Sequence, residues 1–453
     1  MLTYQLKKAP GVPLYEALYR CIRQDILSGK LSAHEKLPSK RALAVHLEVS
    51  KITVEAAYNQ LLAEGFIRSV EKVGYFVENL PKQPAAPIAK EAAEVRRDDL
   101  IDLTGNSPSH FPFSVWSSLQ REVMLDLGEG LLLPLHKQGL PSLRNAIARH
   151  LNQFRGMQVD PDNILIGAGT DFLYNLLVQL LGRDKIYGVE EPGYGKIQKI
   201  YEAAGAACNL LSLDADGVDP EDLGDTQVLH ISPSHHFPSG IVMSNPRRQE
   251  LLRWASGQED RWIIEDDYDS EFRFNAHPMP AMHTLNGGEK VIYLNTFSKT
   301  LAPSIRISYM VLPASLMDRF RQRLGFYSCT VPSFEQHTLE RFISRGYFEK
   351  HINRMRKTYK SIRNRVLAAI TGCSKAKHFT ILEEHAGLHF LLQVALPLTD
   401  AQLQEKCREL GLRVAPLSSY YRSPEENSHC LVINYSGLTE ESLKKLEDIL
   451  RSL

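Results

Sequence analysis

A single lysine follows a strand-like apolar run and lies among side chains that can hold an anion. In "YLNTFSKTLAPSIRISYM", residues 293–310, Lys299 comes directly after Ser298 and seven residues before Arg306. An arginine grips a phosphate through two parallel hydrogen bonds. The segment therefore places an amine beside a predicted phosphate site, where it could form a Schiff base with the aldehyde of a phosphorylated compound.

An acidic segment precedes this lysine and offers a partner for such a compound. "RWIIEDDYDSEF" is an apolar run that ends in carboxylates, with Asp266 33 residues before Lys299 and Tyr268 two residues after Asp266. Pyridoxal phosphate (PLP) needs a lysine, an acid at its pyridine nitrogen, an aromatic side chain over its ring and a phosphate cup. Asp266 is predicted to keep the ring nitrogen protonated, and Tyr268 to hydrogen-bond the phenolic oxygen.

The ring face and the phosphate cup also have candidates. Tyr194 in "EEPGYGKI" is the predicted aromatic side chain, and "GAGTD" is predicted to open a helix whose backbone amides face the phosphate. Each pattern alone has an ordinary reading too, as an exposed lysine, an acidic loop, a tight turn or a packed tyrosine. Their order along the chain favours the cofactor site. The predicted phosphate cup consists of Gly169, Thr170, Asp171, Ser298 and Arg306.

The elements that must position these residues alternate in type. Strand-like runs separated by longer helical patterns predict βαβ units and a mainly parallel sheet, which binds ligands at the carboxyl ends of its strands. Near the end, "GLHFLLQV" and "HCLVINYS" predict strands of a smaller α+β part, and "TEESLKKLEDILRSL" predicts an amphipathic helix capped by Thr439. The strand-like runs are "NILIGAG", "KIYGVEE", "QVLHISP", "RWIIEDD" and "KVIYLNT".

The amino-terminal part predicts a winged helix. In "KLPSKRALAVHLEVSKITVEAAYNQLLAEGFI", Ser39 and Ser50 can each cap a short helix, and a tight turn joins the two helices. "GFIRSVEKVGYFV" predicts a hairpin, the wing, with Gly74 near its tip. Lys51 and Thr53 would open the recognition helix, where side chains meet base edges and phosphates. A small helical domain that only packs is the alternative.

The chain is too long for one domain, and its composition changes once. The 453 residues favour two or three domains, and "NLPKQPAAPIAKEAAEVRRD" is rich in proline, alanine and charge, which is typical of a linker. We therefore expect a DNA-binding domain over residues 1–79, a linker over 80–98 and a PLP domain over 99–453. Its small α+β part is expected from about 330 to 453.

Charge and cysteine usage narrow the class of protein. The formal net charge is zero, and residues 1–79 hold eleven basic against eight acidic side chains, a mild asymmetry. The six cysteines form no C-x-x-C pair, which argues against a zinc site or a disulfide framework, and we expect no metal at His235 and His236. No signal-peptide pattern and no apolar run near the ~20 residues of a membrane span occur. We expect a soluble, cytoplasmic protein.

Two parts of the chain resemble known families. "LPSKRALAVHLEVSKITVEAAYNQLLAEGFI" and "GYFV" resemble the winged helix of GntR-type bacterial regulators, over most of residues 13–79. Residues 99–453 resemble the fold-type-I, aspartate-aminotransferase-like PLP proteins through "GLPSLRNAIARHL", "EEPGYG", "SPSHHFPSG", "IIEDDYDSEFR", "TFSKTLAPSIR" and "HINRMRKTY". The whole chain is thus similar to MocR/GabR-type transcription regulators, in which a winged helix-turn-helix is fused to an α/β PLP domain.

This resemblance implies roles for single residues and for the assembly. Lys299 would carry PLP as a Schiff base, Asp266 would face the pyridine nitrogen and Tyr268 the phenolic oxygen. Tyr194 would cover the ring face. The resemblance also implies a head-to-tail homodimer, with each winged helix resting on the partner's large domain. The predicted DNA-binding residues are Ser39, Arg41, Lys51, Thr53 and Gly74, of which Arg41, Lys51 and Gly74 match the DNA contacts of the GntR family.

Near the cofactor the chain departs from the family pattern. Asn295, Ser304 and Ser308 stand where glycines are usual, and Asp171 stands where glutamine is usual. A carboxylate cannot aim at a phosphate, so only the backbone amide of Asp171 is expected to help. In the winged helix, Glu55 replaces a residue that is basic in some members.

The departure that bears most on activity lies near the carboxyl terminus. Aminotransferases carry an arginine there that clamps the substrate's α-carboxylate, and alignment through Tyr435 puts Val432 at that position. Valine cannot pair with a buried carboxylate. Lys196 is the predicted substitute and effector-binding residue, although it offers a point charge and no planar fork.

Three functions remain open on the sequence. The first is a PLP-dependent transcription regulator that binds double-stranded DNA half-sites and senses PLP, or an amine that reacts with it, through Lys299. The second is an active aminotransferase with an accessory DNA-binding head, which the valine at position 432 disfavours. The third is a DNA-binding protein whose PLP domain only dimerises. PLP itself is the favoured effector.

Overall fold

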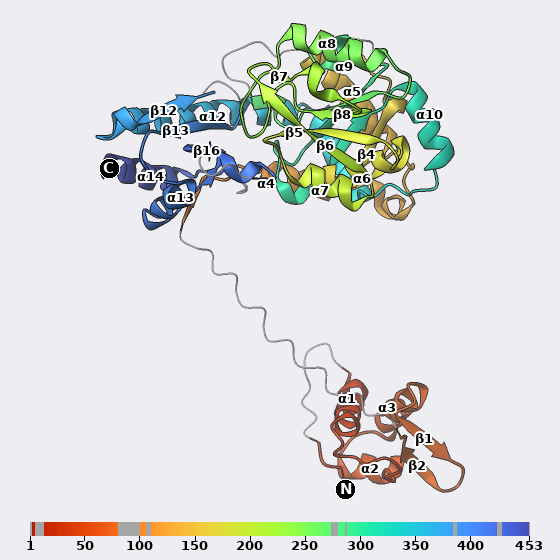
Figure 1. Cartoon of the computed structure of the whole chain (residues 1–453). Coiled ribbons are helices and arrows are strands. Elements are labelled where there is room, and N and C mark those ends of the chain that lie inside the picture. The colour runs from red at the N-terminus through yellow and green to blue at the C-terminus, as the bar shows by residue number, and fades with distance from the viewer. Residues whose placement is uncertain are drawn as a thin grey trace. The chain divides into compact units, whose positions relative to one another are not determined.

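The computed structural model forms two compact units, one on each side of residues 80–99 (Figure 1). It describes residues 2–4, 13–79, 100–105, 110–272, 280–285, 288–383, 387–423 and 428–452. The predicted linker over residues 80–98 lies outside this described part of the chain.

The amino-terminal unit has the predicted helix-turn-helix and wing. Ser39 Oγ accepts a hydrogen bond from Ala42 N at 3.2 Å, and Ser50 Oγ accepts one from Thr53 N at 3.1 Å, so both predicted caps are confirmed. Three helices and a hairpin share one apolar core. The elements are α1 (Leu14–Leu27), α2 (Lys40–His46), α3 (Lys51–Ala63), β1 (Ile67–Val70) and β2 (Gly74–Val77).

The wing depends on a glycine at the start of its second strand. β1 and β2 pair antiparallel, with Val70 opposite Gly74. Gly74 has φ +134°, and a Cβ there would lie 3.2 Å from Lys36 Cε. A larger residue would therefore strain the backbone and crowd the lysine stem.

The second unit is built on an eight-stranded sheet in the order β4-β11-β10-β9-β8-β5-β6-β7. The pairs β10–β9, β9–β8, β8–β5 and β5–β6 are parallel, which confirms the predicted mainly parallel sheet. The strands are β4 (Ile164–Gly167), β5 (Ile186–Glu191), β6 (Ala207–Asp214), β7 (Gly217–Val218), β8 (Val228–Ile231), β9 (Trp262–Asp266), β10 (Val291–Thr296) and β11 (Ser308–Val311).

Both faces of this sheet are covered, because alternate residues of each strand point to opposite sides. In β9, Trp262 and Ile264 belong to the core shared with α6, α7 and α10, whereas Ile263 belongs to a core with α8 and α9. Toward β4, the second face packs on α5, α11 and α12. These helices are α5 (Pro141–Arg155), α6 (Thr170–Leu181), α7 (Lys196–Ala203), α8 (Asn245–Ser256), α9 (Met282–Leu285), α10 (Ala314–Arg323), α11 (Ser333–Ser344) and α12 (Tyr347–Gly372).

A smaller α+β part completes the unit, with a sheet in the order β12-β13-β16-β15. Thr439 Oγ1 accepts from Ser442 N at 3.2 Å and caps the last helix, as predicted. The remaining elements are β3 (Ile101–Asp102), which pairs with β14 (Leu412–Arg413), α4 (Phe113–Leu127), β12 (Phe379–Leu382), β13 (His389–Val394), α13 (Asp400–Glu409), β15 (Ala415–Pro416), β16 (Cys430–Asn434) and α14 (Glu440–Ser452).

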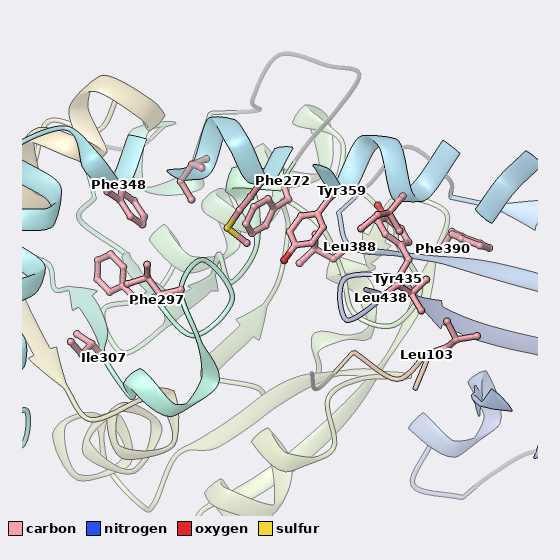
Figure 2. Packing of buried hydrophobic residues seen from close by; sticks show 14 of the residues in the cluster. Leu103, Phe272, Phe297, Ile307, Phe348, Tyr359, Leu388, Phe390, Tyr435 and Leu438 are labelled. Carbon is pink, nitrogen blue, oxygen red and sulfur yellow. The ribbon is translucent and has the colours of Figure 1, made fainter. Parts of the chain in front are cut away.

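One continuous apolar core joins this smaller part to the large sheet. Figure 2 shows Phe297 between Ile307 and Phe348 of α12, and farther along the same helix Tyr359 lies close to Phe272. Phe390 of β13 and Tyr435 continue the same cluster with rings 6.2 Å apart. The long helix α12 therefore fixes the small sheet relative to the strand ends where the candidate site lies.

Candidate functional site

The predicted cofactor residues lie at the carboxyl ends of strands. Asp266 is the last residue of β9, and Lys299 comes three residues after β10, the parallel neighbour of β9. Tyr194 comes three residues after β5, and Gly169 separates β4 from α6, which Thr170 opens. The carboxyl ends of parallel strands form one edge of the sheet, the usual place for a ligand. Strand order therefore gathers segments that are far apart in sequence.

Asp266 is buried and has one free oxygen. Its Oδ2 accepts a hydrogen bond from the Tyr174 hydroxyl of α6 at 2.5 Å and lies 3.4 Å from His230 Nε2. Its Oδ1 is buried and has no hydrogen-bond partner in the described part of the chain. An unsatisfied buried acceptor costs about 1–3 kcal/mol. This oxygen fits the protonated nitrogen of a pyridine ring.

Lys299 presents a half-buried amine whose pKa is lowered. Burial is the main cause, and the nearby Asp269 carboxylate opposes it. No hydrogen bond to Lys299 Nζ occurs among the described residues. A lowered pKa favours the neutral amine, which is the form that attacks an aldehyde.

A buried histidine–aspartate pair lies next to the tyrosine predicted for the phenolic oxygen. His235 Nδ1 is 2.8 Å from Asp269 Oδ2 and 3.4 Å from the hydroxyl of Tyr268. Burial, followed by Asp269, raises the pKa of Tyr268 well above its usual value. Tyr268 therefore stays protonated and can donate a hydrogen bond. His235 contacts the predicted site residues, and the described residues include no group of His, Cys, Asp and Glu that could hold a metal.

The predicted phosphate cup is held together by the side chain of Asp171. Its Oδ2 lies 3.2 Å from Arg306 Nη2 and 2.6 Å from Lys196 Nζ. Gly169 has φ +90°, and a Cβ there would lie 2.2 Å from Arg306 Nη2, so only glycine fits beside the guanidinium. Lys196, the predicted effector-binding residue, is thus paired with Asp171 in this structure.

Hydroxyl groups line the other side of the cup. Ser298 N donates to Thr296 Oγ1 at 3.1 Å, and Thr296 donates from that oxygen to Ser298 Oγ at 3.0 Å. Ser308, which stands where glycine is usual, donates to Thr296 Oγ1 at 2.8 Å. The serine at position 308 is therefore fully buried and satisfied within the strand pair β10–β11.

Tyr194 lies at the rim of the site with 49% of its surface exposed. Its ring meets Phe237 edge to face, with centroids 6.4 Å apart. Gly193, the residue before it, donates its N–H to Tyr420 O at 3.1 Å, which ties this turn to the small part of the unit.

Val432, at the position where aminotransferases carry a carboxylate-binding arginine, lies in an apolar environment. It is 1% exposed in the centre of β16, opposite Leu391 of β13 and Ala415 of β15. Leu391, Cys430 and Val432 form a separate small core. The residues packed against that core are Phe237, Leu417 and Tyr420.

Sequence reasoning missed the residues that hold the predicted ones. Tyr174 and His230 bind Asp266, and Asp269 pairs with His235. Tyr174 lies in an apolar helix pattern, where its hydroxyl gave no signal. Asp269 did carry a signal, as a further carboxylate in "EDDYD".

The candidate DNA-binding face lies on α2 and α3. The structure places Arg41 and Lys51 at exposed positions, and Thr53 in the first turn of α3. Val45 and Ile52 are 75% and 78% exposed on the same two helices, and sequence reasoning missed both. In the sequence, each is an apolar residue that lies outside the buried face of its helix. Apolar side chains of this type can contact thymine methyl groups.

Glu55, where some relatives have a basic residue, has an intramolecular partner. Lys40 Nζ lies 2.7 Å from Glu55 Oε1, and the same ammonium lies 5.4 Å from the centre of the Tyr75 ring. The carboxylate therefore links the two helices of the motif to the wing.

No helix in the described ranges is long and apolar enough to cross a membrane.

Comparison with known families accounts for nearly the whole chain. Residues 98–450 match the family described as aminotransferase class I and II, and residues 14–77 match the bacterial regulatory proteins of the gntR family. Membership of the aminotransferase family, together with structural neighbours that are PLP enzymes, confirms PLP as the predicted cofactor.

Relatives have the same two-part organisation. The HTH-type transcriptional regulator YdeL of Bacillus subtilis is 36% identical, with 98% of each chain covered. The probable rhizopine catabolism regulatory protein MocR of Rhizobium meliloti is 32% identical, over 99% of this chain and 95% of MocR. The pyridoxine biosynthesis regulator PdxR of Corynebacterium glutamicum is 29% identical, over 93% of this chain and 92% of PdxR.

The fold of the second unit is shared with solved enzymes. The kynurenine aminotransferase of Pyrococcus horikoshii has a TM-score of 0.67 and 25% identity, over 79% of this chain and 92% of that enzyme. The likeness confirms the predicted fold-type-I aminotransferase-like domain. The chain therefore belongs to the MocR-type regulators, in which a GntR-family winged helix is joined to an aminotransferase class I and II domain.

Proposed function

We propose that this protein is a transcription regulator that senses PLP through Lys299. The observation that carries the proposal is the pair formed by the buried Asp266 Oδ1, which has no hydrogen-bond partner among the described residues, and the half-buried Lys299 amine at the same edge of the sheet. The Asp266 oxygen suits a protonated pyridine nitrogen, and the Lys299 amine suits an aldehyde.

The residues present fit the cofactor at each of its ends. Lys299 would attach it as a Schiff base, Asp266 would hold the pyridine nitrogen, and Tyr268 would donate to the phenolic oxygen. When bound, PLP supplies an aldehyde and an electron-withdrawing ring. The amides that open α6, with Ser298 and Arg306, would hold the phosphate. Tyr194 would cover the exposed ring face.

The winged helix is the proposed DNA-binding part. Arg41, Lys51 and Thr53 are proposed to contact the operator, with Ser39 and Gly74 holding the motif and the wing in position. We propose a head-to-tail homodimer, because two winged helices would then read two half-sites. A protein that binds chromosomal DNA works in the cytoplasm.

PLP itself is the effector that the surroundings favour. A substrate carboxylate finds no cation at Val432, whose neighbours are apolar, and Lys196 is paired with Asp171. These features argue against an active aminotransferase, the alternative function. The relative PdxR, a regulator of pyridoxine biosynthesis, supports the same effector. An effector acts on transcription only if it binds one DNA-competent arrangement better than another.

A covalent-trapping experiment tests the proposal. After incubation with PLP and reduction with borohydride, mass spectrometry should find the cofactor on Lys299, and DNA-shift assays should show an operator affinity that PLP changes. Lys299→Ala should lose both effects, whereas Lys377→Ala, at an exposed lysine, should keep them. A PLP response that survives in Lys299→Ala would refute the sensing role.

A further inference from the structure

A cavity lies beside the candidate cofactor site. Its volume is about 250 Å³, and it is bounded by the end of β5, the start of α7, the end of β8 and the segment Ser419–Arg422. Drug-sized ligands occupy roughly 300–1,000 Å³, so this cavity suits a smaller molecule. Of the predicted cofactor-binding residues, all of which the structure describes, only Tyr194 lines it.

The cavity contains a buried carboxyl group with a free oxygen. The Glu190 side chain is 8% exposed. Its Oε2 accepts a hydrogen bond from Ser232 N at 2.9 Å. Within the described residues its Oε1 has no hydrogen-bond partner. This oxygen can therefore accept a hydrogen bond from a ligand.

Among the described residues, none forms a charged pair with Glu190. His236 Nε2 lies 3.6 Å from Glu190 Oε2, but burial lowers the pKa of that imidazole to about 3 and keeps it uncharged. His236 instead meets Ser239 Oγ through Nδ1 at 2.7 Å. From the neighbouring strands, His230 lines the same cavity and Asp266 adds negative potential. The inner end of the cavity therefore favours a cation.

The walls and the outer end of the cavity have a different character. Tyr194, Tyr420 and Tyr421 line it. Lys199 and Arg422 line it as well and are both exposed. The guanidinium of Arg422 lies 3.4 Å from Glu202 Oε1. The cavity thus has a carboxyl group at its inner end and two basic side chains at its outer end, where Glu191 Oε1 also accepts a hydrogen bond from Arg422 N at 2.8 Å.

We infer that this cavity is a non-covalent binding site for a small amino acid. The ligand's ammonium would lie against Glu190, and its acid group would lie toward Lys199 and Arg422. This site goes beyond the proposed Schiff base at Lys299, because no bond to the ligand forms. Tyr194 lines this cavity and is also the residue predicted to cover the cofactor ring.

The charge state of Glu190 gives the site a pH signature. Burial raises the pKa of Glu190 to about 8, with a smaller contribution from Asp266, so most of the protein carries a neutral acid there at pH 7. Binding of an ammonium ligand requires the ionised carboxylate of Glu190, so the proton of Glu190 is released on binding. Affinity should therefore rise about tenfold per pH unit from pH 6 to 7 and level off above 8, while a ligand amine with a pKa near ~10 stays charged.

Calorimetric titration of the full chain loaded with PLP tests the inference. The probes are 5-aminopentanoate, pentylamine and pentanoate, which differ only in their charged ends. We expect 5-aminopentanoate to bind best and pentanoate not to bind. Glu190→Gln keeps an acceptor for Ser232 N and should lose at least tenfold in affinity together with the pH dependence. Arg422→Gln should weaken 5-aminopentanoate and leave pentylamine unchanged. Glu335→Gln, at a half-buried glutamate of α11, is the matched control.

The outcomes separate this site from the cofactor site. Binding that leaves the cofactor's absorbance unchanged and is lost in Glu190→Gln supports the inference. No binding by the wild type, equal binding of pentanoate, or unchanged affinity in Glu190→Gln overturns it. A spectral change that accompanies binding would place the amine at the cofactor and overturn it as well. The proposed Schiff base at Lys299 stands or falls independently, on the trapping experiment.

Discussion

Replacing Asp171 with asparagine should tighten the binding of PLP. In the structure this carboxylate pairs with two cations, Arg306 of the predicted phosphate cup at 3.2 Å and Lys196 at 2.6 Å. A phosphate group must take Arg306 away from Asp171 and then remain beside a like charge. Asparagine has nearly the same shape and removes both penalties. Glutamine, the residue that the family pattern carries there, should act in the same direction.

The size of the effect follows from exposure and distance. The side chains of Asp171 and Arg306 are 35% and 47% exposed, and such an ion pair is worth about 0.2–1 kcal/mol. A phosphate on the same guanidinium would lie roughly 6 Å from the carboxylate, where unit charges in water repel by about 0.7 kcal/mol. Together these give about 1–2 kcal/mol, or about a 5- to 30-fold gain in affinity.

The assay is a titration of cofactor-free protein with PLP, followed by the absorbance band that Lys299→Ala removes. Asp126→Asn is the matched control, because Asp126 is 60% exposed and lies 2.8 Å from Arg341 Nη1, outside the predicted cofactor residues. It should leave the affinity unchanged. Equal or weaker PLP binding by Asp171→Asn, with the control unaffected, would refute the idea that Asp171 competes with phosphate.

Three further predictions concern DNA binding and stability. Arg41→Ala should weaken operator binding and lower the slope of log affinity against log salt by about 1, and an unchanged slope in filter-binding assays would remove Arg41 from the phosphate contacts. Ser50→Ala should lower the free energy of unfolding of the amino-terminal unit by about 1 kcal/mol, since the Ser50 hydroxyl oxygen caps α3. A denaturant titration of the full chain should show this loss only in the unfolding transition of that unit. Asp267→Asn should cost about 3–5 kcal/mol, because it removes the carboxylate that lies 2.9 Å from the Arg155 guanidinium, which is 1% exposed. A melting temperature equal to that of the wild type would contradict this.

The sequence was sufficient for features that depend on local pattern. Ser39 and Ser50 precede helices at capping positions, and alternating apolar runs identify the strands, so the helix-turn-helix and the parallel sheet could be predicted. The rule that ligands bind at the carboxyl ends of strands then places Asp266 and Lys299 near each other. Each of these inferences uses residues that are close in the chain or a general property of parallel sheets.

Contacts between distant segments could not be predicted in this way. Asp171 was expected to contribute only its backbone amide, yet its side chain holds Arg306 and Lys196. Such a contact depends on the order of strands in the sheet, which puts β4 beside β11 and so brings the start of α6 to Arg306. Spacing along the chain contains no record of that order.

In the acidic segment that ends β9, the direction of each side chain follows from the local strand pattern, whereas its partners come from distant segments. Alternate residues of a strand point to opposite faces, so Asp266 must face α6, as Trp262 and Ile264 do, while Glu265 and Asp267 face the other side. The strand pattern predicts the face to which each of these carboxylates points, but the tertiary structure determines which groups they contact. Glu265 accepts the backbone N–H groups of α9, and Asp267 meets Arg155 at the end of α5. With its neighbours engaged on the opposite face, Asp266 keeps the oxygen that a cofactor nitrogen could use.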